Sequence, residues 1–152
     1  MRHFAWKPLR LALGSVLAGI SAVPVAAQER AFARTPDDPA IEWGGCPGFM
    51  PEGCQTGVLH GDPAKPDADI FFRVPGGAEM ARHWHNSPER MVLVTGEMRV
   101  SYDGQEPVTL EPRSYAYGPV RKPHSGTCLS AEPCTLFIAF TGPIDAMEGA
   151  PD

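Results

Sequence analysis

The sequence predicts an all-β protein, on three observations. From position 69 onward, short runs rich in β-branched and aromatic residues follow one another, and turn signals such as "PGG", "NSP" and "DG" separate them. The run "EMRVSY" alternates, so that Met98, Val100 and Tyr102 share one face of a strand. No segment after position 27 carries a sustained helical period of apolar residues. This combination is typical of a β-sandwich or barrel.

Residues 1–27 have the layout of a secretory signal peptide. Arg2, Lys7 and Arg10 precede the apolar run Leu11–Val23, and small residues end at Ala27, where we expect cleavage. A membrane anchor is the weaker interpretation, because a bilayer span needs roughly 20 apolar residues. The sequence therefore predicts an exported protein, periplasmic or secreted, with no stable membrane anchor after cleavage.

Removal of residues 1–27 would leave an acidic chain. The segment holds three of the 13 Lys and Arg residues and none of the 18 Asp and Glu residues, so the rest has a formal charge of −8. An acidic surface repels phosphate backbones, and no basic stripe interrupts it. We therefore expect no nucleic-acid partner.

The mature chain divides by composition. Residues 28–68 are rich in Pro, Gly and Asp, and we expect an N-terminal arm with at most short strands. Residues 69–145 contain the strand runs and form the predicted β-barrel, and residues 146–152 form a C-terminal tail.

Four cysteines follow the predicted signal. An even count in an exported chain favours two disulfides, although four cysteines allow three pairings. We favour the two local pairs, because each brackets a short turn-rich loop: Cys46 with Cys54, and Cys128 with Cys134. The first pair would staple the arm.

The stretch "RHWHNSPE" carries the chemistry. His83 and His85 lie two apart on a predicted strand, so both imidazoles point to one side while Trp84 points to the other. Residues 86–88 read as a turn, after which Glu89 opens the next strand. A hairpin would then bring the carboxylate of Glu89 back toward the two rings.

A fourth ligand must come from another segment. His60 lies in the arm, whereas His124 ends "YGPVRKPH" just beyond the predicted strand "SYAYG", so we favour His124. A set of three His and one Glu suits one divalent transition metal: Fe, Mn, Ni, Zn or Cu, which the sequence does not distinguish.

The stretch "GAEMARHWHNSPERMVLVTG" resembles the first conserved motif of the cupin superfamily, and its spacing from Gly77 to Gly96 is a complete match. The second motif is matched in part, by Pro119 and His124. Arg113 and Arg121 replace two of its glycines, and Cys128 stands where asparagine is usual.

The segment "GVLHGDPAKPDADIFFRVPGGAEMARHWH" also looks like the entry to small secreted bacterial cupins, and the whole resemblance covers about residues 57–142. It implies a cupin-type jelly roll or conical β-barrel, with the metal inside the barrel and often a homodimer. Cupins include dioxygenases, isomerases, lyases and metal-free binding proteins, so the fold does not name a reaction.

Three further residues are candidates for a substrate pocket. Met91 follows Glu89 on the same strand face, which indicates a partly apolar cavity. Tyr115 and Tyr117 share one face of the strand leading to His124; either they contact substrate or they pack in the core or at the rim.

Two functions remain open at this point. The first is a metalloenzyme of oxygenase, isomerase or lyase type acting on a small oxygen-rich or carboxylate-bearing molecule, with Glu89 as ligand or as catalytic base. The alternative is a non-catalytic periplasmic module that binds or senses a metal or a small ligand. A purely structural role for the histidines survives only if His124 does not reach the others.

Overall fold

A computed structural model of the chain describes residues 29–152, and the predicted signal peptide lies outside the described residues. Residues Ala33–Asp152 form one compact unit. Among the described residues no helix is long and apolar enough to cross a membrane. The regular structure of residues 29–152 consists of strands, as the sequence predicts.

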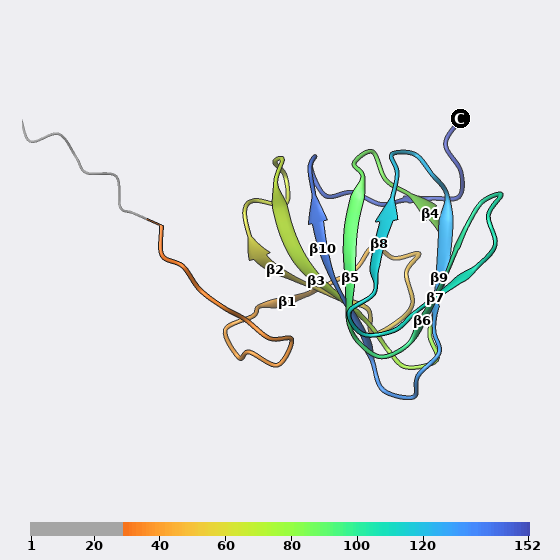
Figure 1. Cartoon of the computed structure of the whole chain (residues 1–152). Coiled ribbons are helices and arrows are strands. Elements are labelled where there is room, and N and C mark those ends of the chain that lie inside the picture. The colour runs from red at the N-terminus through yellow and green to blue at the C-terminus, as the bar shows by residue number, and fades with distance from the viewer. Residues whose placement is uncertain (1–28) are drawn as a thin grey trace, which may run out of the picture. The chain divides into compact units, whose positions relative to one another are not determined.

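The strands form two antiparallel sheets (Figure 1). The first has six strands, in the order β1 (Trp43–Gly45), β2 (Gln55–His60), β3 (Ala68–Val74), β10 (Cys134–Phe140), β5 (Glu89–Thr95) and β8 (Tyr115–Gly118). The second has five strands, in the order β11 (Met147–Glu148), β4 (Glu79–Trp84), β9 (His124–Cys128), β6 (Met98–Tyr102) and β7 (Val108–Leu110).

The core is built from alternate residues of these strands. Met91 and Leu93 of β5 are buried, as are Met98 and Val100 of β6, while their neighbours along each strand are more exposed. The Asp-Gly turn after β6 forms as expected, with Gly104 at a positive φ of 72° and the Gln105 amide donating to the Tyr102 carbonyl.

The segment predicted as an arm contributes to the six-stranded sheet. β1 pairs with β2, and the six-residue β2 pairs with β3 along most of its length. The loop between β1 and β2 carries the disulfide Cys46–Cys54, and the second disulfide joins Cys128 to Cys134. Both are the local pairs that the sequence favours.

The chain changes sheets between His85 and Glu89, so the expected β4–β5 hairpin is wrong. β4 belongs to the five-stranded sheet and β5 to the six-stranded one. Pro88 cannot continue the ladder, and the hydroxyl of buried Ser87 accepts a hydrogen bond from the Gly142 amide at 2.9 Å. This corner sends Glu89 toward the histidines from the opposite sheet.

The sequence does not predict strand β9; it places His124 only just beyond the predicted strand "SYAYG". Its residues are "HSGTC", a run without large apolar side chains, so no local pattern marks it. Pairing with β4 on one side and β6 on the other holds it as a strand. His124 is therefore the first residue of a central strand.

Candidate metal centre

Three histidines converge between the sheets. His83 of β4 and His124 of β9 are paired residues of adjacent strands, and their ring centroids lie 4.2 Å apart. His85 follows β4 directly, with its ring centroid 5.0 Å from that of His83 and 5.3 Å from that of His124. Potential ligand atoms of the three all lie within 4.8 Å of one another, so they could hold one ion.

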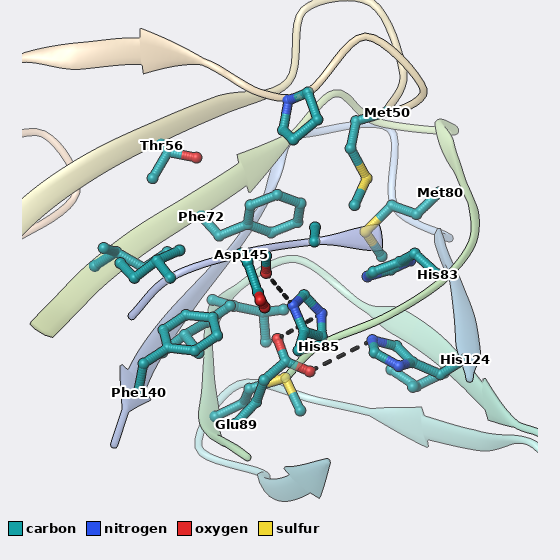
Figure 2. A pocket seen from close by; sticks show the side chains of 18 of the residues that line it. Met50, Thr56, Phe72, Met80, His83, His85, Glu89, His124, Phe140 and Asp145 are labelled. Carbon is teal, nitrogen blue, oxygen red and sulfur yellow. Dashed lines mark hydrogen bonds and ion pairs between the residues drawn. The ribbon is translucent and has the colours of Figure 1, made fainter. Parts of the chain in front are cut away.

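Glu89 faces these rings from the six-stranded sheet. Its Oε1 lies 3.3 Å from His85 Nε2, and its Oε2 lies 3.4 Å from His124 Nε2. Figure 2 shows both imidazoles turned toward the carboxylate, with His83 beside Met80. The four side chains predicted from the sequence thus lie together at one place.

Backbone carbonyls fix the tautomer of each histidine. The Nδ1 of His83 lies 2.7 Å from the Ala81 carbonyl oxygen, that of His124 lies 3.1 Å from the Lys122 carbonyl oxygen, and that of His85 contacts the Asp145 carbonyl oxygen. A carbonyl oxygen only accepts, so each Nδ1 must carry the proton and donate it. Each Nε2 is left with a free lone pair, as a metal ligand requires.

The site is buried and incompletely satisfied. His83 and Glu89 are each 4% exposed, and His85 and His124 are each 7% exposed. Nε2 of His85 and Oε2 of Glu89 have no hydrogen-bond partner among the described residues. Unpaired polar atoms are costly in a protein interior. A cation between them would supply the missing partner, so this donor set fits a metal ion.

Burial also favours the neutral form of two of the rings, those of His83 and His124. Desolvation, and secondarily the nearby His124, lower the pKa of His83 to about 3. Desolvation likewise lowers the pKa of His124, although the Glu89 carboxylate opposes this shift. Neutral imidazoles bind metal, whereas imidazolium cannot, so the lowered pKa values keep His83 and His124 available as donors in mildly acidic solution.

This shift predicts that the metal-free protein loses stability in acid. Unfolded, His83 takes up a proton near its ordinary pKa of 6.5; folded, it does so only near 3. The unfolded state therefore binds more protons between these values, and the free energy of unfolding falls as pH falls through that range. Urea unfolding of chelator-treated protein at several pH values measures how the free energy of unfolding changes with pH.

In the His83→Gln variant the free energy of unfolding should depend less steeply on pH. The lost slope corresponds to at most one proton taken up on unfolding. The His60→Gln variant is the control, because His60 is exposed on β2. Equal slopes for His83→Gln and the parent protein would contradict the assignment of this effect to His83.

Gly118 leaves room for the Glu89 carboxylate. The two residues are paired across β5 and β8, and a Cβ at Gly118 would lie 2.9 Å from Glu89 Oε2 and 3.3 Å from the Tyr102 hydroxyl. We predict that Gly118→Ala pushes the carboxylate aside and weakens metal affinity by about 10–100-fold, the usual cost of disturbing a ligand's support. Competition against a chromophoric chelator measures the affinity.

Gly44→Ala is the matched control, because the nearest atom to a Cβ there is 3.8 Å away, an ordinary contact. If both variants bind metal as the parent protein does, Gly118 does not position Glu89.

Residues 37–145 match the family model of the ChrR cupin-like domain. The chain belongs to this family. No curated protein matches it. The cupin resemblance read from the two motifs is therefore confirmed.

Solved structures share the fold of this cupin. The DMSP lyase DddQ from Ruegeria pomeroyi DSS-3 superposes with a TM-score of 0.62 at 18% identity, covering 74% of this chain and 62% of that one. A structure described as "Crystal structures of DMSP lyases RdDddP and RnDddQII" superposes with a TM-score of 0.63 at 18% identity, covering 72% of this chain and 62% of that one. An oxalate decarboxylase from Bacillus subtilis superposes with a TM-score of 0.56 at 18% identity, covering 66% of this chain and 28% of that one. At these identities the likeness shows the fold alone.

The cupin's four candidate ligands lie at the wall of a cavity of about 160 Å³. Met91 lines it, as expected from its position after Glu89. Sequence reasoning missed much of the rest of the wall, because these residues come from segments far apart in the chain: Met50, Thr56, Phe72, Met80, Ser125 and Asp145.

Tyr115 and Tyr117 do not line this cavity, so their prediction as pocket residues is wrong. Tyr115 is 63% exposed and Tyr117 is 52% exposed, on the outer face of β8. The inner face of that strand is formed by Ala116 and Gly118, because Glu89 and the core leave space only for small residues there.

The two arginines that replace motif glycines keep the glycine backbone conformation. Arg113 has a φ of 81° and Arg121 a φ of 57°, both in the left-handed region that favours glycine. The Arg121 amide donates to the His85 carbonyl at 2.9 Å, and its guanidinium lies 4.8 Å from the Trp84 ring centroid. These contacts help hold the turn before His124 in place.

Proposed function

We propose that His83, His85, Glu89 and His124 bind one divalent transition metal, and that this cupin is an enzyme acting on a small molecule with an oxygen donor. One observation carries the proposal: in each of the three histidines, Nδ1 donates to a backbone carbonyl oxygen, which leaves Nε2 free to bind a metal. Glu89 Oε2, which has no hydrogen-bond partner among the described residues, supports it. Iron, manganese, nickel, zinc and copper all suit these ligands.

The chain's own residues have separable roles in this proposal. The carbonyls of residues 81, 122 and 145 orient the rings, and Glu89 adds a negative charge that offsets the ion. When bound, the metal would polarise a substrate oxygen as a Lewis acid or support oxygen chemistry. The apolar wall would exclude water from the reacting atoms.

A non-catalytic binding or sensing module is the second candidate. It predicts no cavity beyond the metal, whereas a cavity of about 160 Å³ lined by Met91 adjoins the candidate ligands, which supports the enzyme. Such a module would hold its ion with no position open to solvent or substrate.

Export and assembly belong to the same proposal. Two disulfides favour an oxidising compartment, periplasmic or secreted. A homodimer and the signal peptide at residues 1–27 stay predictions.

The test is elemental analysis of protein purified without chelator, followed by water-proton relaxation of the manganese-loaded form. An enzyme should contain near-stoichiometric metal and show an exchangeable water on manganese. Bound metal without exchangeable water would favour the sensing module instead. Folded, disulfide-intact protein that binds no metal would refute the metalloenzyme and leave a module that binds a small ligand.

A further inference from the structure

The cavity beside the candidate metal centre has no cationic side chain. None of the described residues that line it is a lysine or an arginine. Its charged residues are two acids, Glu89 and Asp145, and the Asp145 carboxylate already accepts hydrogen bonds from the Asn86 amide and side chain at 3.0 and 2.6 Å. An anionic group inside this cavity would therefore meet no positive charge from the protein itself.

The rest of the wall is mostly aliphatic, aromatic or thioether. Met50, Met80, Met91 and Met98 all contribute to it, and Figure 2 shows Met50 and Met80 on the same side as Phe72. Among side chains outside the candidate ligands, the hydroxyls of Thr56 and Ser125 can each donate one hydrogen bond but carry no charge. Methionine adapts to varied apolar shapes, which suits a compact hydrophobic ligand.

We infer that the ligand of this site is a small, largely apolar molecule with a single oxygen-donor end and at most one negative charge. The inference rests on the proposed metal centre, which would supply a positive charge for that end that no described lining residue provides. It narrows the oxygen-rich and carboxylate-bearing molecules expected from the sequence, because an oxygen-rich molecule finds few partners on this wall.

Dicarboxylates are the compounds that the cavity should reject. One carboxylate can face the metal, but the second would be buried among thioether and aliphatic groups. Burying a charge without a partner is strongly unfavourable, and nearby Asp145 adds repulsion. A monocarboxylate of the same chain length avoids this cost and gains from burial of its apolar tail.

The experiment uses cobalt(II)-loaded protein, whose visible absorption reports a ligand entering near the metal. Butanoate and butanedioate are titrated as a matched four-carbon pair at one ionic strength. We expect butanoate to bind at least tenfold more tightly. Equal affinities, or tighter binding of butanedioate, would overturn the inference.

A second experiment places a cationic side chain at the cavity. Met50 is partly buried, lines the cavity and packs against the core from the loop closed by the Cys46–Cys54 disulfide, so Met50→Lys puts an ammonium group beside the cavity. Val108→Lys is the control, because Val108 is 55% exposed and does not line the cavity. Met50→Lys should reduce the preference for butanoate several-fold, and Val108→Lys should leave it unchanged.

The outcomes separate the two proposals. Protein that does not take up cobalt refutes the metal centre itself. Cobalt-loaded protein whose preference is absent, or is unaltered by Met50→Lys, refutes only the charge argument.

Discussion

Replacing His83 or His124 by alanine is expected to abolish stoichiometric metal binding. Disturbing residues that merely support a metal ligand costs about 10–100-fold in affinity, so removing a ligand should cost more than 100-fold. Both rings are buried, and their centroids lie 5.0 and 5.3 Å from that of His85. An exposed side chain elsewhere on the surface therefore cannot take the place of either ring. Metal content after dialysis against a metal buffer, together with chelator competition, measures the loss.

Tyr117→Ala is the control, because that ring is 52% exposed on the outer face of β8. Glu89→Gln keeps the shape of the side chain but removes its charge, so its affinity should lie between those of the parent protein and the histidine variants. If both histidine variants stay folded and retain one metal per chain, the four residues are not the ligands.

The second large effect is on folding, at Gly76. A Cβ there would lie 1.9 Å from the Ala131 carbonyl oxygen, and 2.8 Å from that of Ser130. The Gly77 amide bonds the Ser130 and Cys128 carbonyls at 3.1 Å, and the Cys128–Cys134 disulfide closes the same loop, so the loop cannot move aside freely. We expect Gly76→Ala to destabilise the protein by about 3 kcal/mol, the upper range for overpacking.

Urea unfolding measures this change. Gly45→Ala is the control, since no atom lies within 4 Å of a Cβ at that position, and its midpoint should shift little. An unchanged midpoint for Gly76→Ala would contradict this prediction, because the loop at Ala131 would then move aside without loss of stability.

Local spacing was sufficient to find the candidate ligands. His83 and His85 share a face because side chains alternate along a strand, and Glu89 follows after one short turn. None of this requires knowledge of distant pairings, and the position of His124 just beyond the run "SYAYG" favoured it over His60. The strand runs between residues 69 and 145 were also visible, because alternation and turn residues are local properties.

Features that depend on long-range pairing could not be read in this way. The turn at residues 86–88 looks the same whether it closes a hairpin or crosses between sheets, and only the strand order decides. The tyrosines and small residues of β8 alternate, but which set faces inward depends on Glu89 pairing with Gly118. β9 is a strand through its neighbours rather than through its composition.

The crossing at residues 86–88 makes an ion at this site a cross-link. The ion would be held by His83 and His124 in the sheet of β4 and β9, by His85 directly after β4, and by Glu89 in the sheet of β5. The two sheets could then not separate without releasing the ion. Folding and metal occupancy are then linked by mass action: free metal at 100 times its dissociation constant adds about 2.7 kcal/mol to the free energy of unfolding. The melting temperature should therefore rise with metal concentration, and a chain stripped of its ion should open first along the seam between the two layers.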